Sequence, residues 1–202
     1  KKYFRYETNK IAASASIHPC AYIAPEGVNI GENVIIAPNA TILCGVEIGD
    51  NTTIGPNCVI GEDGFHVFED LNATKRIVIH DGFVKIGKNV DIQASVTVDK
   101  GFMGRNTVIG DECKIDNAVH IAHRVHVGRK TLIASGACIA GSADIGENVW
   151  IGPHSVISNR VSICDNAKIL IGSIVIRNIK KAISVSGNFA VEHAKHIKSQ
   201  CS

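Results

Sequence analysis

The chain has 202 residues, of which 45% are hydrophobic and 20% charged, with a formal net charge of +2. This balance fits one globular domain, and the small charge without a basic run argues against a nucleic-acid surface. Seven cysteines form an odd set without a CxxC pair, which favours a reducing cytoplasm over a disulfide framework or zinc knuckle. No apolar run approaches the ~18 residues of a spanning helix, and the charged start lacks a signal-peptide apolar segment. We therefore expect a cytoplasmic protein without a membrane span.

Aliphatic residues recur at every sixth position, after residues 1–16, which we expect to form an N-terminal extension. The first block of these anchors is Ile30, Ile36, Ile42, Ile48, Ile54 and Ile60. A period of six fits neither a helix nor a simple alternation, but it fits a short strand and a tight corner, repeated. Three such strands close one triangular coil. The sequence thus predicts an all-β solenoid, a parallel β-helix over residues 17–176.

Two segments interrupt the period. Residues 62–83 and 99–107 lack the hexad pattern and are expected to bulge out as loops or a small hairpin. Insertions into a solenoid can be tolerated surface loops, or they can collect on a binding face. The aromatic residues Phe65, His66, Phe68 and Phe83 favour a functional role for the first loop, because exposed aromatic rings need somewhere to pack.

The second block of anchors is longer and contains no slip. Its members are Ile109, Ile115, Ile121, Val127, Ile133, Ile139, Ile145, Ile151, Ile157, Ile163 and Ile169. The fifth position of each of these hexads is small or β-branched, so it is expected to point inward beside the anchor. After Ile169 the pattern fades, and residues 177–202 are expected to form a C-terminal extension. Its segment NFAVEHAKHIKSQ reads as a short amphipathic helix with Asn188 as a possible N-cap.

Stacking turns the period into geometry, because a coil of 18 residues places residue n beside residue n+18 on the next coil. His123 therefore neighbours Gly141 and then Asn159, with Arg160 on the same corner. A histidine, a glycine N–H and an arginine can supply a base, an oxyanion donor and an anion clamp. These are the groups needed to transfer an acyl group from a thioester.

Other interpretations of the histidines stay open at this point. His123 could be a solvated corner residue, and His120 and His126 are closer still to that description. The spacing of three among these histidines could also suggest a zinc site, as in a carbonic anhydrase of the same fold, but successive strands of a coil turn away from one another. We therefore expect no metal.

Several motifs in order resemble one family. From about Ile17 to Lys198, the motifs IGEDGF (60–65), VDKG (98–101), IDNAVHIAH (115–123), IAGS (139–142) and VSGN (185–188) resemble the UDP-3-O-(3-hydroxyacyl)glucosamine N-acyltransferases of lipid A synthesis and related nucleotide-sugar N-acyltransferases. The resemblance implies a left-handed β-helix and a homotrimer with clefts between subunits, so that both inserted loops could reach across an interface. It also implies that His123 is the catalytic base, Asp116 its supporting carboxylate and Gly141 the oxyanion donor.

Further contacts are expected on the same basis. The substrate would be bound by Arg160, Asn159, Phe65 and His66, and the acyl donor by Gly141, Ser142 and Arg160. Arg160 stands where the family has a second histidine that helps to hold the phosphates, and an arginine can clamp a diphosphate in its place.

Only about 16 residues precede the first hexad, so we expect no counterpart of the family's large N-terminal uridine-binding domain, and we expect its C-terminal bundle to be reduced to one helix. These departures favour a smaller relative that transfers an acetyl group from acetyl-CoA to a nucleotide-linked amino sugar in bacterial surface-glycan synthesis. The alternatives are 3-hydroxyacyl transfer from acyl carrier protein in lipid A-type synthesis, transfer to a hydroxyl instead of an amine, and a non-catalytic β-helix binding or scaffold module.

Overall fold

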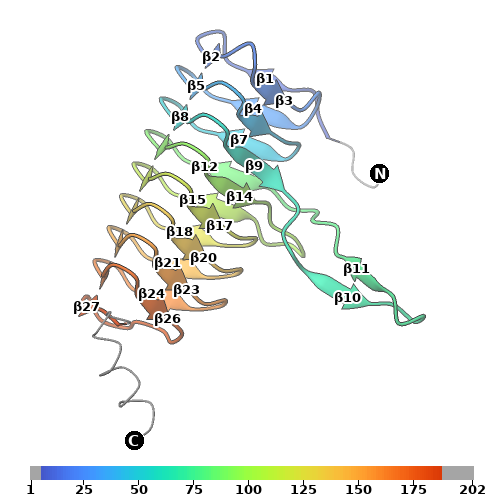
Figure 1. The fold of residues 1–202 in the computed structure, drawn as a ribbon. Coiled ribbons are helices and arrows are strands. Elements are labelled where there is room, and N and C mark those ends of the chain that lie inside the picture. The colour runs from blue at the N-terminus through green and yellow to red at the C-terminus, as the bar shows by residue number, and fades with distance from the viewer. Residues whose placement is uncertain (1–5, 188–202) are drawn as a thin grey trace, which may run out of the picture.

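A computed structural model describes residues 6–187 of the chain. Three parallel sheets form the sides of a left-handed β-helix, whose coils follow one another from the N-terminal to the C-terminal end (Figure 1). Residues 6–187 contain no helix, and so none that is long and apolar enough to cross a membrane. The predicted C-terminal helix, NFAVEHAKHIKSQ, lies outside the described residues.

The first sheet has eight strands, in the stacking order β1 (Lys10–Ile11), β4 (Val28–Ile30), β7 (Val46–Ile48), β12 (Val84–Ile86), β15 (Thr107–Ile109), β18 (His126–Val127), β21 (Asp144–Ile145) and β24 (Ser162–Ile163). The second has nine, β2 (Ser16–Ile17), β5 (Ile35–Ile36), β8 (Thr53–Ile54), β13 (Asp91–Ile92), β16 (Lys114–Ile115), β19 (Leu132–Ile133), β22 (Trp150–Ile151), β25 (Lys168–Ile169) and β27 (Ser184–Val185). The third has eight, β3 (Tyr22–Ile23), β6 (Thr41–Ile42), β9 (Val59–Glu62), β14 (Thr97–Asp99), β17 (His120–Ile121), β20 (Cys138–Ile139), β23 (Val156–Ile157) and β26 (Ile174–Val175).

The register follows the six-residue period. His120 pairs with Cys138, and His126 pairs with Asp144, so neighbouring coils are offset by 18 residues as predicted. Strand pairing begins at Lys10, within the segment that we expected to be an extension, and continues to Val185, beyond the expected end at 176. The regular coil is therefore longer than the hexad pattern alone indicated.

The core is a narrow column of aliphatic anchors and small residues. Every anchor from Ile109 to Ile169 is at most 3% exposed, and the fifth-position residues are buried with them. These are Cys113, Val119, Val125, Thr131, Ala137, Ala143, Val149, Ser155, Val161, Ala167 and Ser173. The buried hydroxyls find acceptors in carbonyls, as Thr131 does at Gly146 O (2.9 Å), so their burial leaves no unpaired donor.

The corners need a left-handed backbone, which asparagine tolerates better than most residues. Asn33, Asn51, Asn148 and Asn166 all have φ between 53° and 59°. The amide of Asn33 donates to that of Asn51 at 3.1 Å, and Asn148 donates to Asn166 at 2.7 Å. Stacked side chains therefore link equivalent corners of successive coils.

The inserted loops leave the register of the coils intact. In the first loop, β10 (Val67–Glu69) and β11 (Lys75–Ile77) form an antiparallel hairpin that projects from one side of the stack (Figure 1). Thr97 pairs with Val59 on one side and with His120 on the other, so the third sheet continues past both insertions. The loops therefore leave and rejoin the coil close to the corner that follows β17.

A substitution at Ala167 can test how tightly the core is packed. Replacing it with leucine adds volume to a fully buried position, and we expect the free energy of unfolding to fall by about 1–3 kcal/mol because the column cannot widen. Lys168→Leu is the matched control, since the neighbouring side chain is exposed, and it should change stability by less than about 0.5 kcal/mol. Urea denaturation of both variants makes the comparison, and equal stabilities would contradict the inward placement.

Candidate active site

His123 lies on the corner that follows β17, and equivalent positions of the next two coils stack beneath it. The Ser142 N–H donates to the carbonyl of His123 at 2.9 Å, and the Arg160 N–H donates to the carbonyl of Gly141 at 3.1 Å. The predicted succession of His123, Gly141 and the Asn159–Arg160 corner is therefore present in the backbone.

Two glycines leave the space that the His123 ring fills. A Cβ atom on Gly141 would lie 2.7 Å from Nε2 of His123 and closer still to Cε1, while a Cβ on Gly64 would lie 2.7 Å from Cδ2. Neither position admits a side chain without moving the ring. Among the described residues, the N–H of Gly141 has no hydrogen-bond acceptor. His123 Nε2 thus lies beside an unused backbone donor.

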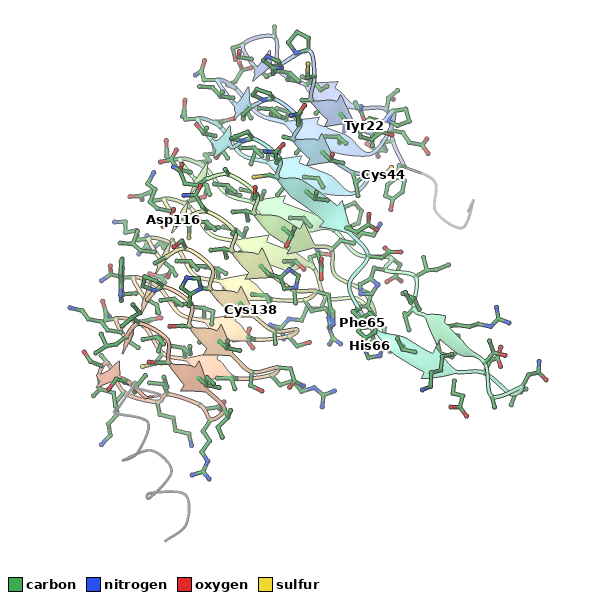
Figure 2. The ribbon with its side chains drawn as sticks, in the orientation of Figure 1. Tyr22, Cys44, Phe65, His66, Asp116 and Cys138 are labelled. Atoms are coloured by element: carbon green, nitrogen blue, oxygen red, sulfur yellow. The ribbon has the colours of Figure 1, made fainter. Side chains whose placement is uncertain are left out.

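The inserted loops surround His123 with aromatic rings. His66 and His80 come from the first loop, and their ring centroids lie 5.9 and 5.4 Å from that of His123. Phe102, from the second loop, is 1% exposed and lies 5.1 Å away. Figure 2 shows Phe65 and His66 where the hairpin meets the stack. The loops therefore build one wall of the site, and Phe102 anchors that wall in the protein interior.

A carboxylate reaches the site from β14. Asp99 Oδ2 lies 3.8 Å from Nε2 of His120, whose Nδ1 is hydrogen-bonded to the hydroxyl of Thr97 at 2.7 Å. Burial raises the pKa of Asp99 above its ordinary value, more than the nearby His120 and His80 lower it. Asp99 also borders the space above Gly64, next to the His123 ring.

His123 is held in its neutral form. Burial, then the neighbouring His80 and His66 and the cationic Arg124, lower its pKa from 6.5 to about 4. Since the unfolded chain would bind a proton at this histidine between pH 6.5 and 4 and the folded chain would not, this group destabilises the fold as pH falls through that window. At neutral pH, however, the ring has a free lone pair, which a general base requires.

Arg124 is the arginine nearest to His123. Its guanidinium lies 5.2 Å from the centroid of the Phe102 ring, and its Nε is buried without a hydrogen-bond partner among the described residues. Arg160 is exposed at the corner one coil beyond Gly141, and within residues 6–187 its side chain forms no ion pair. Sequence reasoning had assigned the anion clamp to Arg160, whereas the structure offers Arg124 beside the base.

Within one copy of the chain Asp116 lies away from His123, so its support of the base stays a prediction. Asp116 accepts hydrogen bonds from the backbone N–H groups of Asn117 (2.7 Å) and Ser135 (3.2 Å), at the corner between the second and third sheets. His123 lies at the next corner, between the third and first sheets. The seven residues that separate them span one side of the triangular coil, and Figure 2 shows Asp116 far from His66 and Phe65.

The remaining predicted residues are placed less centrally. Phe65 is 85% exposed and has no ring partner within residues 6–187, whereas His66 packs on Phe102 at a centroid distance of 5.1 Å. Asn159 is exposed, and Ser142 contributes its backbone to the stack. Sequence reasoning missed His80, Phe102, Asp99 and Gly64, because their distance from His123 along the chain gives no signal in a six-residue period.

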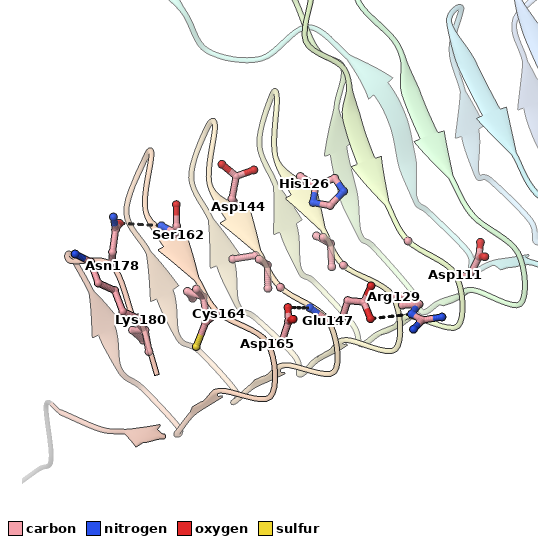
Figure 3. A pocket seen from close by; sticks show the side chains of 17 residues that line it. Asp111, His126, Arg129, Asp144, Glu147, Ser162, Cys164, Asp165, Asn178 and Lys180 are labelled. Atoms are coloured by element: carbon pink, nitrogen blue, oxygen red, sulfur yellow. Dashed lines mark hydrogen bonds and ion pairs between the residues drawn. The ribbon is translucent and has the colours of Figure 1, made fainter. Parts of the chain in front are cut away.

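A separate surface groove lies away from His123. An open groove on the outer face of the first sheet is lined by polar and charged side chains that include His126, Asp144 and Arg129 (Figure 3). His126 thus lies on a different sheet from His120, so the three histidines of the predicted alternative do not converge. Within residues 6–187 no three His, Cys, Asp or Glu side chains are grouped to hold a metal ion.

Family comparison agrees with the period. The family model described as bacterial transferase hexapeptide (six repeats) matches residues 27–62 and 106–141, and the hexapeptide repeat of succinyl-transferase matches residues 143–177. Among curated relatives, UDP-3-O-acylglucosamine N-acyltransferase of Bordetella pertussis is 33% identical over 165 residues, which are 80% of this chain and 45% of that protein. The corresponding protein of Herminiimonas arsenicoxydans is 35% identical over 158 residues, 78% of this chain and 45% of the relative.

Solved structures show the same architecture. The UDP-N-acetylglucosamine O-acyltransferase of Moraxella catarrhalis aligns with a TM-score of 0.60 and 26% identity, covering 95% of this chain and 76% of that one. The UDP-N-acetylglucosamine acyltransferase of Campylobacter jejuni gives a TM-score of 0.72 and 25% identity, covering 89% and 72%. The chain spans less than half the length of the curated relatives named above.

Arg124 provides a test of the electrostatics. Arg124→Gln removes a cation beside His123, so the pKa of His123 should rise from its depressed value toward 6.5. An NMR titration of the imidazole signals between pH 3.5 and 8 measures the shift. Arg129→Gln is the control, because Arg129 pairs with Glu147 on another face. An unchanged or lower pKa in Arg124→Gln would contradict the proposed environment.

With its hexapeptide-repeat segments, its coil architecture and its curated relatives in agreement, this chain is a hexapeptide-repeat protein of the bacterial transferase type that resembles the UDP-3-O-acylglucosamine N-acyltransferases.

Proposed function

We propose that the His123 corner transfers an acyl group from a thioester to the amine of a nucleotide-linked amino sugar. The observation that carries this proposal is the neutral imidazole of His123, with Nε2 beside the unused N–H of Gly141. Those two groups are what an acyl transfer requires of a protein: one takes a proton, and the other stabilises a developing negative charge.

The proposed acyl transfer needs no reactant besides the amine and the thioester. As the sugar nitrogen attacks the thioester carbonyl, His123 Nε2 takes a proton from that nitrogen. The carbonyl oxygen becomes an oxyanion and accepts a hydrogen bond from the Gly141 N–H. The tetrahedral intermediate then collapses, the carbon–sulfur bond breaks, and the imidazolium returns its proton to the departing thiolate. The products are an amide and a free thiol, and His123 is neutral again.

A fixed cation beside the base fits a charged substrate. Arg124 lies at the same corner as His123 and has unused hydrogen-bonding capacity, so we assign it the contact with a phosphate of the acceptor or donor. Arg160 stands two coils further along the same edge and can extend this contact. His66 and Phe65 border the approach from the hairpin.

The relatives bear on the identity of the acceptor. Their name specifies a UDP-linked glucosamine that already carries an acyl group on O3, and this supports the same acceptor class here, in lipid A-type synthesis. We expected acetyl-CoA because the family's end domains have no counterpart in this sequence. The curated relatives are longer than this chain, so that comparison no longer favours acetyl-CoA over acyl carrier protein. Acetyl-CoA and a 3-hydroxyacyl group on acyl carrier protein present the same thioester to His123, so only a direct comparison separates the donors.

The homotrimer implied by the family resemblance stays a prediction. It is supported by exposed apolar side chains on the projecting hairpin, where Phe68, Leu71 and Ile77 are 47%, 106% and 56% exposed. Such a surface is commonly covered in an assembly. Contact between subunits would bring the loops of one copy close to the coils of the next.

The central experiment combines donors, acceptors and one variant. Thiol release is measured with acetyl-CoA or 3-hydroxyacyl–acyl carrier protein, each with UDP-3-O-acylglucosamine, other nucleotide amino sugars and their hydroxyl analogues. We expect amine-dependent release with one donor, and a loss of at least about 10²-fold in kcat for His123→Ala. His126→Ala is the control, because that side chain lies outside the corner.

Different outcomes have different meanings. Transfer to the hydroxyl analogue would replace N-acylation by O-acylation at the same corner. Near wild-type turnover by a folded His123→Ala variant would overturn the role of the base, and a chain that turns over no thioester while binding the sugar would be a binding module.

Gly141 provides an independent prediction. Gly141→Ala leaves the backbone N–H in place but adds a methyl group that meets the His123 ring, which must then move. A displacement of about 1 Å at a reacting group can cost ~10²-fold, so kcat should fall strongly while the fold persists. Gly187→Ala is the control, because within residues 6–187 no atom lies within 4 Å of its added Cβ. Unchanged kcat in Gly141→Ala would remove this corner from the reaction.

A further inference from the structure

His80 is a buried imidazole that the mechanism above does not use. Its side chain is 0% exposed and packs on Phe102 at a centroid distance of 4.4 Å. Its Nδ1 lies 2.9 Å from the carbonyl oxygen of Val78. Since a carbonyl can only accept, Nδ1 must donate to it, and Nε2 of the neutral ring is left as an acceptor. His80 therefore has a fixed tautomer and a lone pair directed elsewhere.

That lone pair is unpaired, and so is one nitrogen of His123. Among the described residues, His80 Nε2 and His123 Nδ1 are both buried side-chain atoms without a hydrogen-bond partner. The two rings lie at a centroid distance of 5.4 Å with an interplanar angle of 61°. A buried polar atom without a partner is unfavourable, so two such atoms on adjacent rings call for an explanation.

The proposed role of His123 as a general base explains why these two atoms lack other partners within residues 6–187. His123 Nε2 can take a proton from the substrate only if it holds a lone pair, and in a neutral imidazole the hydrogen must then reside on Nδ1. A buried Nδ1–H needs an acceptor. His80 Nε2 is the adjacent buried acceptor, and it has no other partner in the described part of the chain.

We propose that His80 is the positioning residue of His123, accepting the Nδ1–H of His123 and thereby fixing the tautomer and ring orientation of the base. The inference rests on the proposed acyl transfer for its kinetic consequence. The two atoms do not yet lie in hydrogen-bonding geometry, and a rotation of either ring would form the bond from His123 Nδ1–H to His80 Nε2, next to the existing bond from His80 Nδ1–H to the carbonyl of Val78. His80 gives up no proton when the substrate proton arrives at His123 Nε2, so it orients the base and stabilises the imidazolium without changing its own state.

The carboxylates near the site have other partners. Asp99 lies against His120, and Asp63 forms an ion pair with Lys100 at 3.2 Å. Both sit on the Gly64 side of the corner. An imidazole acceptor at Nδ1, unlike a carboxylate there, adds no negative charge beside the base, in agreement with the low pKa of His123.

The test measures the tautomer directly. In the full chain with ¹⁵N-labelled histidine at pH 7, long-range ¹H–¹⁵N correlation spectra should show a protonated Nδ1 and an unprotonated Nε2 for His123. His80→Phe keeps an aromatic ring against Phe102 but removes the acceptor, so His123 should shift toward the Nε2–H form. His80→Gln offers an amide oxygen near the position of Nε2 and should keep much of the wild-type tautomer.

The controls separate this role from simple packing. His66→Phe replaces another ring beside His123 that offers no orphaned buried acceptor, and it should leave the His123 tautomer unchanged. Asp99→Asn tests the competing carboxylate. An unchanged tautomer in His80→Phe, or a change in Asp99→Asn alone, would overturn the proposal. Should His80→Phe fail to fold, as judged by its thermal unfolding, His80→Leu, which also removes the acceptor, takes its place in the same measurement.

Kinetics complete the test. If acyl transfer is established, His80→Phe should lower kcat at least about ten-fold with little change in KM, and His80→Gln should recover part of the loss. A tautomer shift without any acyl transfer would leave the His80–His123 pair standing and reject the proposed function. Acyl transfer that depends on His123 but is indifferent to His80→Phe would reject the pair alone.

Discussion

The structure depends on a column of aliphatic anchors at the centre of a triangular coil. Each coil must bury three anchors and three small residues in a space bounded by parallel ladders on all sides, so the volume available at each level is nearly constant. Isoleucine at the anchor and alanine, valine or threonine at the fifth position satisfy that limit. Because the ladders fix the rise between coils, every side chain is aligned with the one 18 residues away, and functional groups on a corner inherit this alignment.

The two inserted loops are possible because the coils of a solenoid contact only their neighbours. Each coil contacts only its neighbours, so a loop can leave at one corner and return without changing the pairing elsewhere. β14 still pairs with both β9 and β17, although the hairpin and the second loop intervene in sequence. The loops thereby add what a six-residue repeat cannot hold, namely large rings. Phe102 is a fully buried aromatic residue outside the aliphatic column, and it anchors the wall around His123.

The same wall sets the chemistry of the base. Packing rings and an arginine around His123 excludes water and adds positive charge, and both effects disfavour protonation. The lowered pKa keeps His123 neutral at neutral pH, so its lone pair is free to accept a proton. It also makes His123 a weaker base. The glycines on either side serve a complementary purpose, since they allow the ring to approach the backbone of the next coil. A neutral partner such as His80 would orient the ring without cancelling this electrostatic environment.

The sequence by itself determined the β-helix, the inward anchors and the stacking of His123 on Gly141, because all three follow from a period that is visible along the chain. Only the tertiary structure decided which residues surround His123. Spacing along one coil does not tell how far apart two corners lie, so the sequence could not show that one side of the triangle separates Asp116 from His123 within a subunit. His80, Phe102 and Asp99 could not be found from the period, since they reach the corner through loops or across coils. Those contacts depend on how the insertions fold back, and a repeat does not encode that path.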